Sequence, residues 1–118
     1  QKAVYSEDTV LCFSNKAGRQ SAVSSKGEET EAITVDTLCK NKKVTYLKMD
    51  VEGAEEHALK GAYVTFKSQK PKLNIALYHR SEDIFKIPLM ISEINPEYKF
   101  HLRRHPYIPC WDMNLYCI

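Results

Sequence analysis

The sequence predicts an α/β fold built on a partial doubly wound sheet that is mostly parallel, with one antiparallel strand near its edge. Two nearly continuous apolar runs, residues 44–51 and 72–79, are typical of strands buried inside a parallel sheet. Apolar residues at helical spacing follow each run, and this alternation places helices on the faces of the sheet. The last two runs, residues 98–103 and 112–118, form a hairpin that supplies the antiparallel strand.

The N-terminal third is predicted to hold only short elements. Residues 9–13 and 32–35 are short β-type runs. The segment 15–31 is rich in Ser, Gly, Lys and Glu, so we expect it to be an exposed, mobile loop. Asp36 is then expected to cap one helical turn.

Length and composition indicate a single soluble domain over residues 1–118, with the short strands and the loop in residues 1–43 and the core in residues 44–118. A net charge of +2 is too small to predict binding to nucleic acid or to an anionic membrane. No apolar run approaches the roughly 18 residues that span a bilayer. The four cysteines form no C-x-x-C pair, so we expect buried reduced thiols and a cytoplasmic setting.

The elements of the core follow from residue spacing. After the strand at 44–51, Gly53 permits a sharp turn into a helix. One face of this helix is marked by apolar residues four positions apart: Ala54, Ala58, Ala62 and Phe66. After the strand at 72–79, Ser81 is expected to cap the next segment. Pro88 is expected to lie in the first turn of the helix that follows, because a proline further inside would break it.

Acidic residues follow the first core strand at the edge where open α/β sheets bind their ligands, outside the carboxyl ends of the strands. Asp50 ends the strand, and Glu52 and Glu55 flank the turn at Gly53. Carboxylates this close could hold a cation, accept hydrogen bonds from an amine, or take a proton from an attacking hydroxyl. The glutamates could instead merely complement the dipole of the helix that follows.

Tyr78 and His79 end the neighbouring strand at the same edge. A histidine there could act as a general base or donate to a substrate oxygen, or it could simply cap the chain at Ser81 or Glu82. The sequence contains no Gly-x-Gly-x-x-Gly or Walker loop, no nucleophile elbow and no His-rich zinc spacing. No metal-ligating residue is therefore assigned from the sequence.

Two further groups of polar side chains lie outside this edge. Aromatic and imidazole side chains in the last loop could contact an acceptor such as a sugar: His105, Tyr107 and Trp111. Lysines gather at the opposite ends of the core strands, where we expect a solubilising rim and no phosphate site: Lys40, Lys42, Lys43, Lys67, Lys70 and Lys72.

The segment around Asp50 resembles a known family. Residues 46–55, Tyr-Leu-Lys-Met-Asp-Val-Glu-Gly-Ala-Glu, with Leu-Lys-Gly-Ala at 59–62, are similar to the signature of FkbM-type methyltransferases. Residues 75–79, Ile-Ala-Leu-Tyr-His, are similar to the family's next strand. The resemblance covers essentially the whole chain and corresponds to the C-terminal half of a Rossmann-like class I methyltransferase domain.

This resemblance implies an S-adenosylmethionine-dependent O-methyltransferase, with a hydroxyl group of a sugar or other small-molecule secondary metabolite as its acceptor. The site residues that it implies are catalytic Asp50, Glu52 and His79, cofactor-binding Asp50 and Gly53, and substrate-binding Glu55, Tyr78 and His79. The family's Gly-rich cofactor loop precedes the matched segment, so the chain by itself is expected to be inactive. The alternative is a non-catalytic α/β module for binding or assembly.

The strand at 44–51 also predicts self-association. In the family's fold another strand lies beside it, and the missing neighbour would leave its backbone groups unpaired. Long, flat, apolar strand edges recruit partners, so we expect a twofold dimer through this edge. Light scattering at tens of micromolar tests this, and a clean monomer would instead favour an edge covered by the loop at 15–31.

Overall fold

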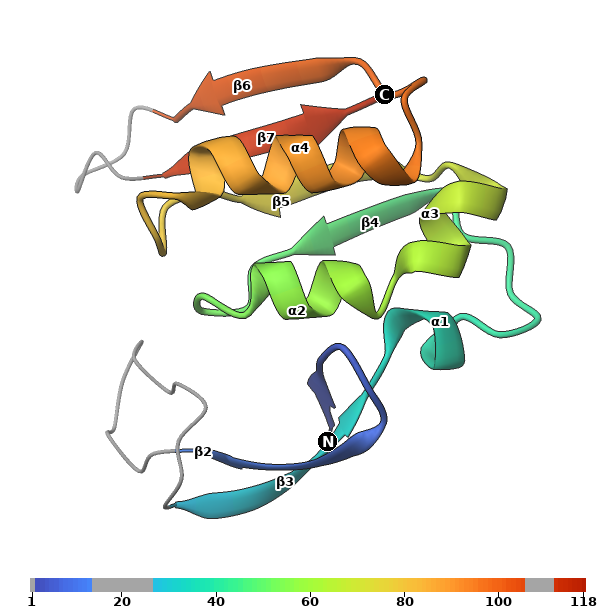
Figure 1. Cartoon of the computed structure of the whole chain (residues 1–118), viewed down its shortest axis with the longest axis vertical. Coiled ribbons are helices and arrows are strands. Elements are labelled where there is room, and N and C mark those ends of the chain that lie inside the picture. The colour runs from blue at the N-terminus through green and yellow to red at the C-terminus, as the bar shows by residue number, and fades with distance from the viewer. Residues whose placement is uncertain (1, 14–26, 106–111) are drawn as a thin grey trace.

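A four-stranded sheet with helices packed against it is the central element of the structure (Figure 1). The computed structural model describes residues 2–13, 27–105 and 112–118. In chain order, the elements of the core are β4 (Tyr46–Met49), α2 (Glu55–Lys60), α3 (Tyr63–Gln69), β5 (Lys72–Ala76), α4 (Asp83–Ile94), β6 (Phe100–Arg104) and β7 (Met113–Cys117). The predicted order of strand, helix, strand, helix and closing hairpin is therefore present.

The sheet is mixed, with the strand order β4-β5-β7-β6. β4 and β5 are parallel, with Leu47 opposite Leu73, whereas β7 pairs antiparallel with both β5 and β6. The closing hairpin is as predicted, and β7 is the reversed strand next to the edge. However, only one of the three strand pairs is parallel, so the expected mostly parallel, doubly wound sheet is not what the described residues form.

Strand β4 lies at an edge of the sheet, and it is shorter and less buried than predicted. It covers four residues, and its side chains alternate between the core, where Met49 is buried, and solvent, where Tyr46 and Lys48 are exposed. The expectation of a strand buried on both faces was wrong because, among the described residues, helices cover only one face. Self-association through this edge stays a prediction.

The helical segment after β4 is broken into α2 and α3 at Gly61 and Ala62. The predicted buried face is confirmed for Ala58, Ala62 and Phe66, which are fully buried, whereas Ala54 is only partly buried. The break lies where another part of the chain approaches, because a Cβ atom on Gly61 would overlap the backbone oxygen of Tyr5. Glycine at this position therefore permits the close contact between α2 and the N-terminal part.

Helix α4 runs through Pro88, contrary to the prediction that the helix would begin there. A proline in a helix removes one backbone hydrogen bond, but Ile87 and Ile91 on either side of it are fully buried and hold the helix to the sheet. Ser81 does not cap this helix either. The residue at the N-cap is Glu82, which makes no side-chain capping bond, and the hydroxyl of Ser81 donates to the carboxylate of Glu82.

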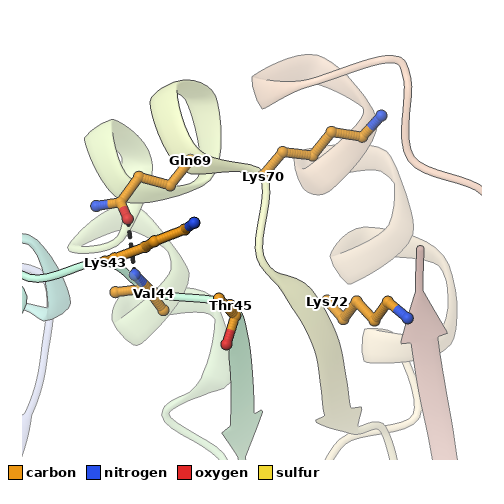
Figure 2. A pocket seen from close by; sticks show the side chains of 6 residues that line it. All are labelled: Lys43, Val44, Thr45, Gln69, Lys70 and Lys72. Atoms are coloured by element: carbon orange, nitrogen blue, oxygen red, sulfur yellow. Dashed lines mark hydrogen bonds between the residues drawn. The ribbon is translucent and has the colours of Figure 1, made fainter.

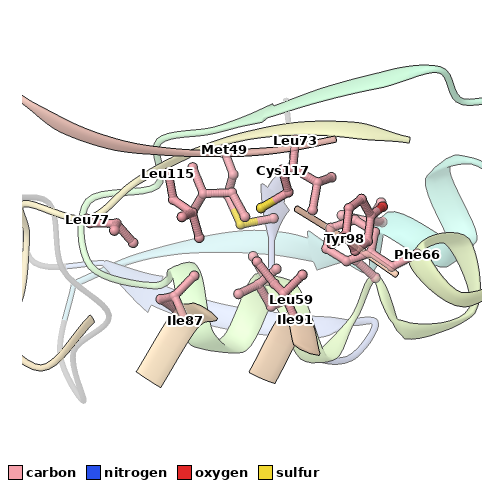
Figure 3. Close-up of a cluster of buried hydrophobic side chains, with 14 residues drawn as sticks. Met49, Leu59, Phe66, Leu73, Leu77, Ile87, Ile91, Tyr98, Leu115 and Cys117 are labelled. Carbon is pink, nitrogen blue, oxygen red and sulfur yellow. The ribbon is translucent and has the colours of Figure 1, made fainter. Parts of the chain in front are cut away.

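The hydrophobic core lies between the four-stranded sheet and the helices (Figure 3). The sheet contributes Met49, Leu73 and Leu115, and the helices contribute residues such as Leu59 and Ile91. The core therefore fixes one face of β4 and β5 against α2 and α4. It thereby positions the ends of those strands, from which the candidate site is built.

The N-terminal part forms a separate three-stranded sheet from β1 (Ala3–Val4), β2 (Thr9–Phe13) and β3 (Glu28–Ile33), in the order β1-β3-β2. The prediction for β2 is confirmed. The predicted loop at 15–31 and strand at 32–35 were placed wrongly, because residues 28–31 pair with β2 as part of β3. Residues 15–26 of that loop lie outside the described residues.

Helix α1 (Val35–Leu38) is capped by Thr34, whose hydroxyl oxygen accepts from the backbone N–H of Thr37 at 3.0 Å. The expectation that Asp36 is the cap was wrong. Its carboxylate instead accepts from the backbone N–H groups of Val64 and Thr65, at 2.9 and 2.8 Å. Asp36 thus caps α3 from a distance, at the helix end where N–H groups lack partners within the helix.

Three of the four cysteines lie among the described residues. Cys12, Cys39 and Cys117 carry free thiols, with Cys117 fully buried and the other two partly buried. Burial raises the pKa of Cys117 to about 12. Cys110 lies outside the described residues. None of the described helices combines the length and the apolar character needed to cross a membrane.

Candidate functional site

The turn after β4 places two carboxylates at the carboxyl end of the sheet. Asp50 directly follows the strand, and the next residues adopt left-handed backbone, with φ of 51° at Glu52 and 91° at Gly53. The backbone N–H of Ala54 donates to the carbonyl of Val51 at 3.1 Å and closes the turn before α2. Gly53 permits the turn as predicted, because a positive φ is strained for a residue with a side chain. Its contact with a cofactor stays a prediction.

His79 reaches this turn from the end of the neighbouring strand β5. Its Nε2 lies 3.6 Å from Asp50 Oδ1 and 3.5 Å from Glu52 Oε2. Its Nδ1 lies 2.8 Å from Glu55 Oε1, which is hydrogen-bonding distance. When Glu55 is ionised it can only accept, so the tautomer that makes this bond carries its proton on Nδ1. In that neutral tautomer the lone pair of Nε2 faces Asp50 and Glu52.

Glu55 is the residue that holds this histidine in place. It is the first residue of α2 and is 0% exposed. Its Oε1 accepts from His79 and from the backbone N–H of Val51 at 3.0 Å, while its Oε2 is buried with no hydrogen-bond partner among the described residues. The prediction that Glu55 contacts a substrate stays untested, but its observed contacts are with the protein.

Tyr78 contacts both Asp50 and His79. Its hydroxyl donates to Asp50 Oδ1 at 3.0 Å, and its ring lies 4.3 Å from that of His79, centroid to centroid. Burial, together with the hydrogen bond to Asp50, raises the pKa of Tyr78 to about 12, so its hydroxyl stays protonated and remains a donor. Lys48 lies 3.7 Å from the second oxygen of Asp50 and supplies one nearby positive charge.

Asp83 is a buried carboxylate near the site. Its burial could not be predicted from the sequence. It lies in the first turn of α4, where an acidic residue usually complements the helix dipole at the surface, yet it is only 2% exposed. Burial and, next, the charge of Glu55 raise its pKa above the usual value for an aspartate. Its position in the chain shortly after β5 indicates that it lies near the site, but its burial depends on how α4 packs against α2.

The structure thus brings together five of the predicted residues from two strand ends: Asp50, Glu52, Glu55, Tyr78 and His79. One oxygen of Asp50, one of Glu52 and one nitrogen of His79 all lie within 4.8 Å of one another. Such a set can exchange a proton with a bound hydroxyl or bind a positively charged group. His105, by contrast, lies with its Nε2 3.1 Å from the hydroxyl of Tyr116, and Tyr107 and Trp111 lie outside the described residues.

An open pocket of about 410 Å³ lies at the other end of the sheet, at the start of β4 and β5 (Figure 2). Its lining consists of Lys43, Val44, Thr45, Gln69, Lys70 and Lys72. The side-chain oxygen of Gln69 accepts from the backbone N–H of Val44 at 2.7 Å and joins α3 to the chain before β4. The pocket is remote from the carboxylate cluster and lies within the predicted lysine rim.

Comparison with known proteins gives two findings. Residues 4–105 match the family described as the methyltransferase FkbM domain. The structure is also similar to the crystal structure of the methyltransferase FkbM from Methylobacillus flagellatus KT, with a TM-score of 0.71 and 38% sequence identity. That similarity covers 76% of this chain but only 24% of the solved chain, so the matched part spans about a quarter of the solved chain's length. No protein with a curated description matches the chain.

Proposed function

Because the chain belongs to the FkbM methyltransferase family, we propose that it forms part of an enzyme that transfers a methyl group from S-adenosylmethionine to a hydroxyl oxygen. The acceptor we propose is a sugar or another small-molecule secondary metabolite. The observation that carries the proposal is the convergence of Asp50, Glu52 and His79 at the carboxyl ends of β4 and β5. Open α/β sheets place their reactive groups at this edge.

The charge of the cluster supports a cationic methyl donor. Asp50, Glu52 and Glu55 contribute carboxylates, and within 4.0 Å of them the described residues supply Lys48 and His79 as charge partners. S-adenosylmethionine, when bound, supplies an electrophilic methyl group on a positively charged sulfur and also carries an ammonium group. Exposed carboxylate oxygens fit both charges, and we assign this role to Asp50 and Glu52.

The acceptor hydroxyl must lose a proton as its oxygen bonds to the methyl group. His79 Nε2 is an available acceptor in the neutral imidazole, because Glu55 fixes the proton on Nδ1. Asp50 is the second candidate acceptor and is held in position by the hydroxyl of Tyr78. Positioned acid–base groups of this kind contribute about 10²–10⁴-fold to rate.

A cytoplasmic setting is part of the proposal. Its support is the free thiols of Cys12, Cys39 and Cys117, since cysteines remain reduced in that compartment.

The proposal is tested with the complete polypeptide that contains residues 1–118 and with S-adenosylmethionine labelled in its methyl group. A panel of sugars and hydroxylated metabolites is offered, each beside the analogue in which the hydroxyl is replaced by hydrogen. We expect S-adenosylhomocysteine to form and the label to enter the hydroxylated compounds but not the deoxy analogues. Binding of the donor with no transfer to any hydroxylated compound would favour a non-catalytic module.

A further inference from the structure

We propose that Asp50, Glu52 and His79 bind one divalent cation of the first transition row. The three residues come from two strand ends, 27 or more positions apart in the sequence, so no local metal motif marks them. One ligand atom from each lies within 4.8 Å of the other two. Two carboxylate oxygens and one imidazole nitrogen are a ligand set for such ions and leave positions open for water or a substrate oxygen.

The distances around His79 match those between ligands of a shared metal ion. Nε2 lies 3.6 Å from Asp50 Oδ1 and 3.5 Å from Glu52 Oε2. A charged N–H···O bond is about 2.7–2.9 Å long, so Nε2 is too far from both oxygens to be donating to either. Ligands held about 2.0–2.2 Å from a tetrahedral ion lie about 3.3–3.6 Å from one another, which agrees with both spacings.

A second observation, on Glu55, points in the same direction. Metal-binding histidines usually donate their other ring N–H to a carboxylate, which fixes the ring and the tautomer. Glu55 does this for His79 at 2.8 Å from a fully buried position outside the ligand set. Its Oε2 has no partner among the described residues, and an unbalanced buried carboxylate is costly. A cation on Nε2 would place a positive charge on the ring that Glu55 contacts.

The binding of the ion does not depend on the reaction, whereas its use rests on the proposed function. A bound cation lowers the pKa of a hydroxyl that coordinates it. The acceptor would then lose its proton more readily. Asp50, Glu52 and His79 would serve as ligands of the ion, and no longer as the partners of the donor's charge or as the base. Glu55 is a positioning residue in this arrangement because it acts through His79.

The test is a titration of the complete polypeptide that contains residues 1–118 with Mn²⁺. Binding is measured by the loss of the free-ion signal in electron paramagnetic resonance, with Zn²⁺ added as a competitor. We expect one ion per chain. Glu52→Gln removes a ligand from an exposed turn and should weaken binding by at least about tenfold, and Glu55→Gln should weaken it by about 10–100-fold. Glu56→Gln is the matched control, because Glu56 pairs with Lys60 at the surface and should bind the ion like the wild type.

Circular dichroism of each variant verifies that the fold is intact. The absence of binding at millimolar Mn²⁺ and Zn²⁺, or equal affinities in the wild type, Glu52→Gln and Glu55→Gln, would overturn the proposal. No methyl donor is present in this experiment, so its failure leaves the proposed methyl transfer standing. Failure of the methyl-transfer assay likewise leaves the metal site standing.

Discussion

Replacing Asp50 by Asn is expected to lower the turnover of methyl transfer by well over tenfold in the complete polypeptide that contains residues 1–118. The change keeps the size of the side chain and an oxygen for the Tyr78 hydroxyl, but it removes the negative charge. Whether Asp50 takes the acceptor proton or holds a cation, that charge is required in the transition state. A tenfold loss corresponds to about 1.4 kcal/mol of activation free energy, and loss of an acid–base group costs about 10²–10⁴-fold.

The measurement is the initial rate of S-adenosylhomocysteine formation at saturating donor and acceptor. Glu93→Gln serves as the control, because Glu93 is an exposed carboxylate on α4 away from the strand ends. The control should retain the wild-type rate. Wild-type turnover in Asp50→Asn would remove this residue from the mechanism.

Phe66→Ala is expected to cause a large loss in the free energy of unfolding. Phe66 is 0% exposed and belongs to the core between α3 and the sheet (Figure 3). Truncating a buried phenylalanine to alanine costs about 3–5 kcal/mol, because it removes apolar contacts and leaves a cavity. Domains are stable by only about 5–15 kcal/mol, so this variant should lose a large share of its free energy of unfolding.

Val64→Ala on the same helix provides the comparison. Val64 is 61% exposed, so its truncation should change the free energy of unfolding by no more than about 0.5 kcal/mol. Urea unfolding followed by circular dichroism measures both variants. Equal midpoints for the two would contradict the assignment of Phe66 to the core.

The sequence predicts the order of elements and the edge of the sheet at which the site forms. The apolar runs that contain β4 and β5 identify neighbouring strands, and their carboxyl ends must then lie side by side. That geometry is enough to expect Asp50 and His79 near each other. The turn at Gly53 follows from a short connection into α2, which only a residue tolerant of positive φ permits.

The remaining features of the fold and the site depend on tertiary packing, which the spacing of residues in the sequence does not reveal. Glu55 and Asp83 occupy first-turn positions where acidic residues usually face water, and only the approach of α4 to α2 buries them. Pro88 is tolerated because the buried residues around it hold the helix in place. Asp36 was assigned to its own helix, yet its partners are backbone groups 28 and 29 positions away.

Asp36 also determines how the two sheets respond to unfolding. The three-stranded sheet shares no strand with the four-stranded one. However, the backbone N–H of Asp36 donates to the carbonyl of Gly61 at 2.9 Å, and its carboxylate accepts from the N–H groups of Val64 and Thr65 in the first turn of α3. Detachment of the N-terminal part would strip α3 of this cap and leave those groups without partners. The amide hydrogens of Val64 and Thr65 should therefore exchange with solvent at the rate at which the N-terminal part opens, so that these two amides report on the cooperativity between the sheets.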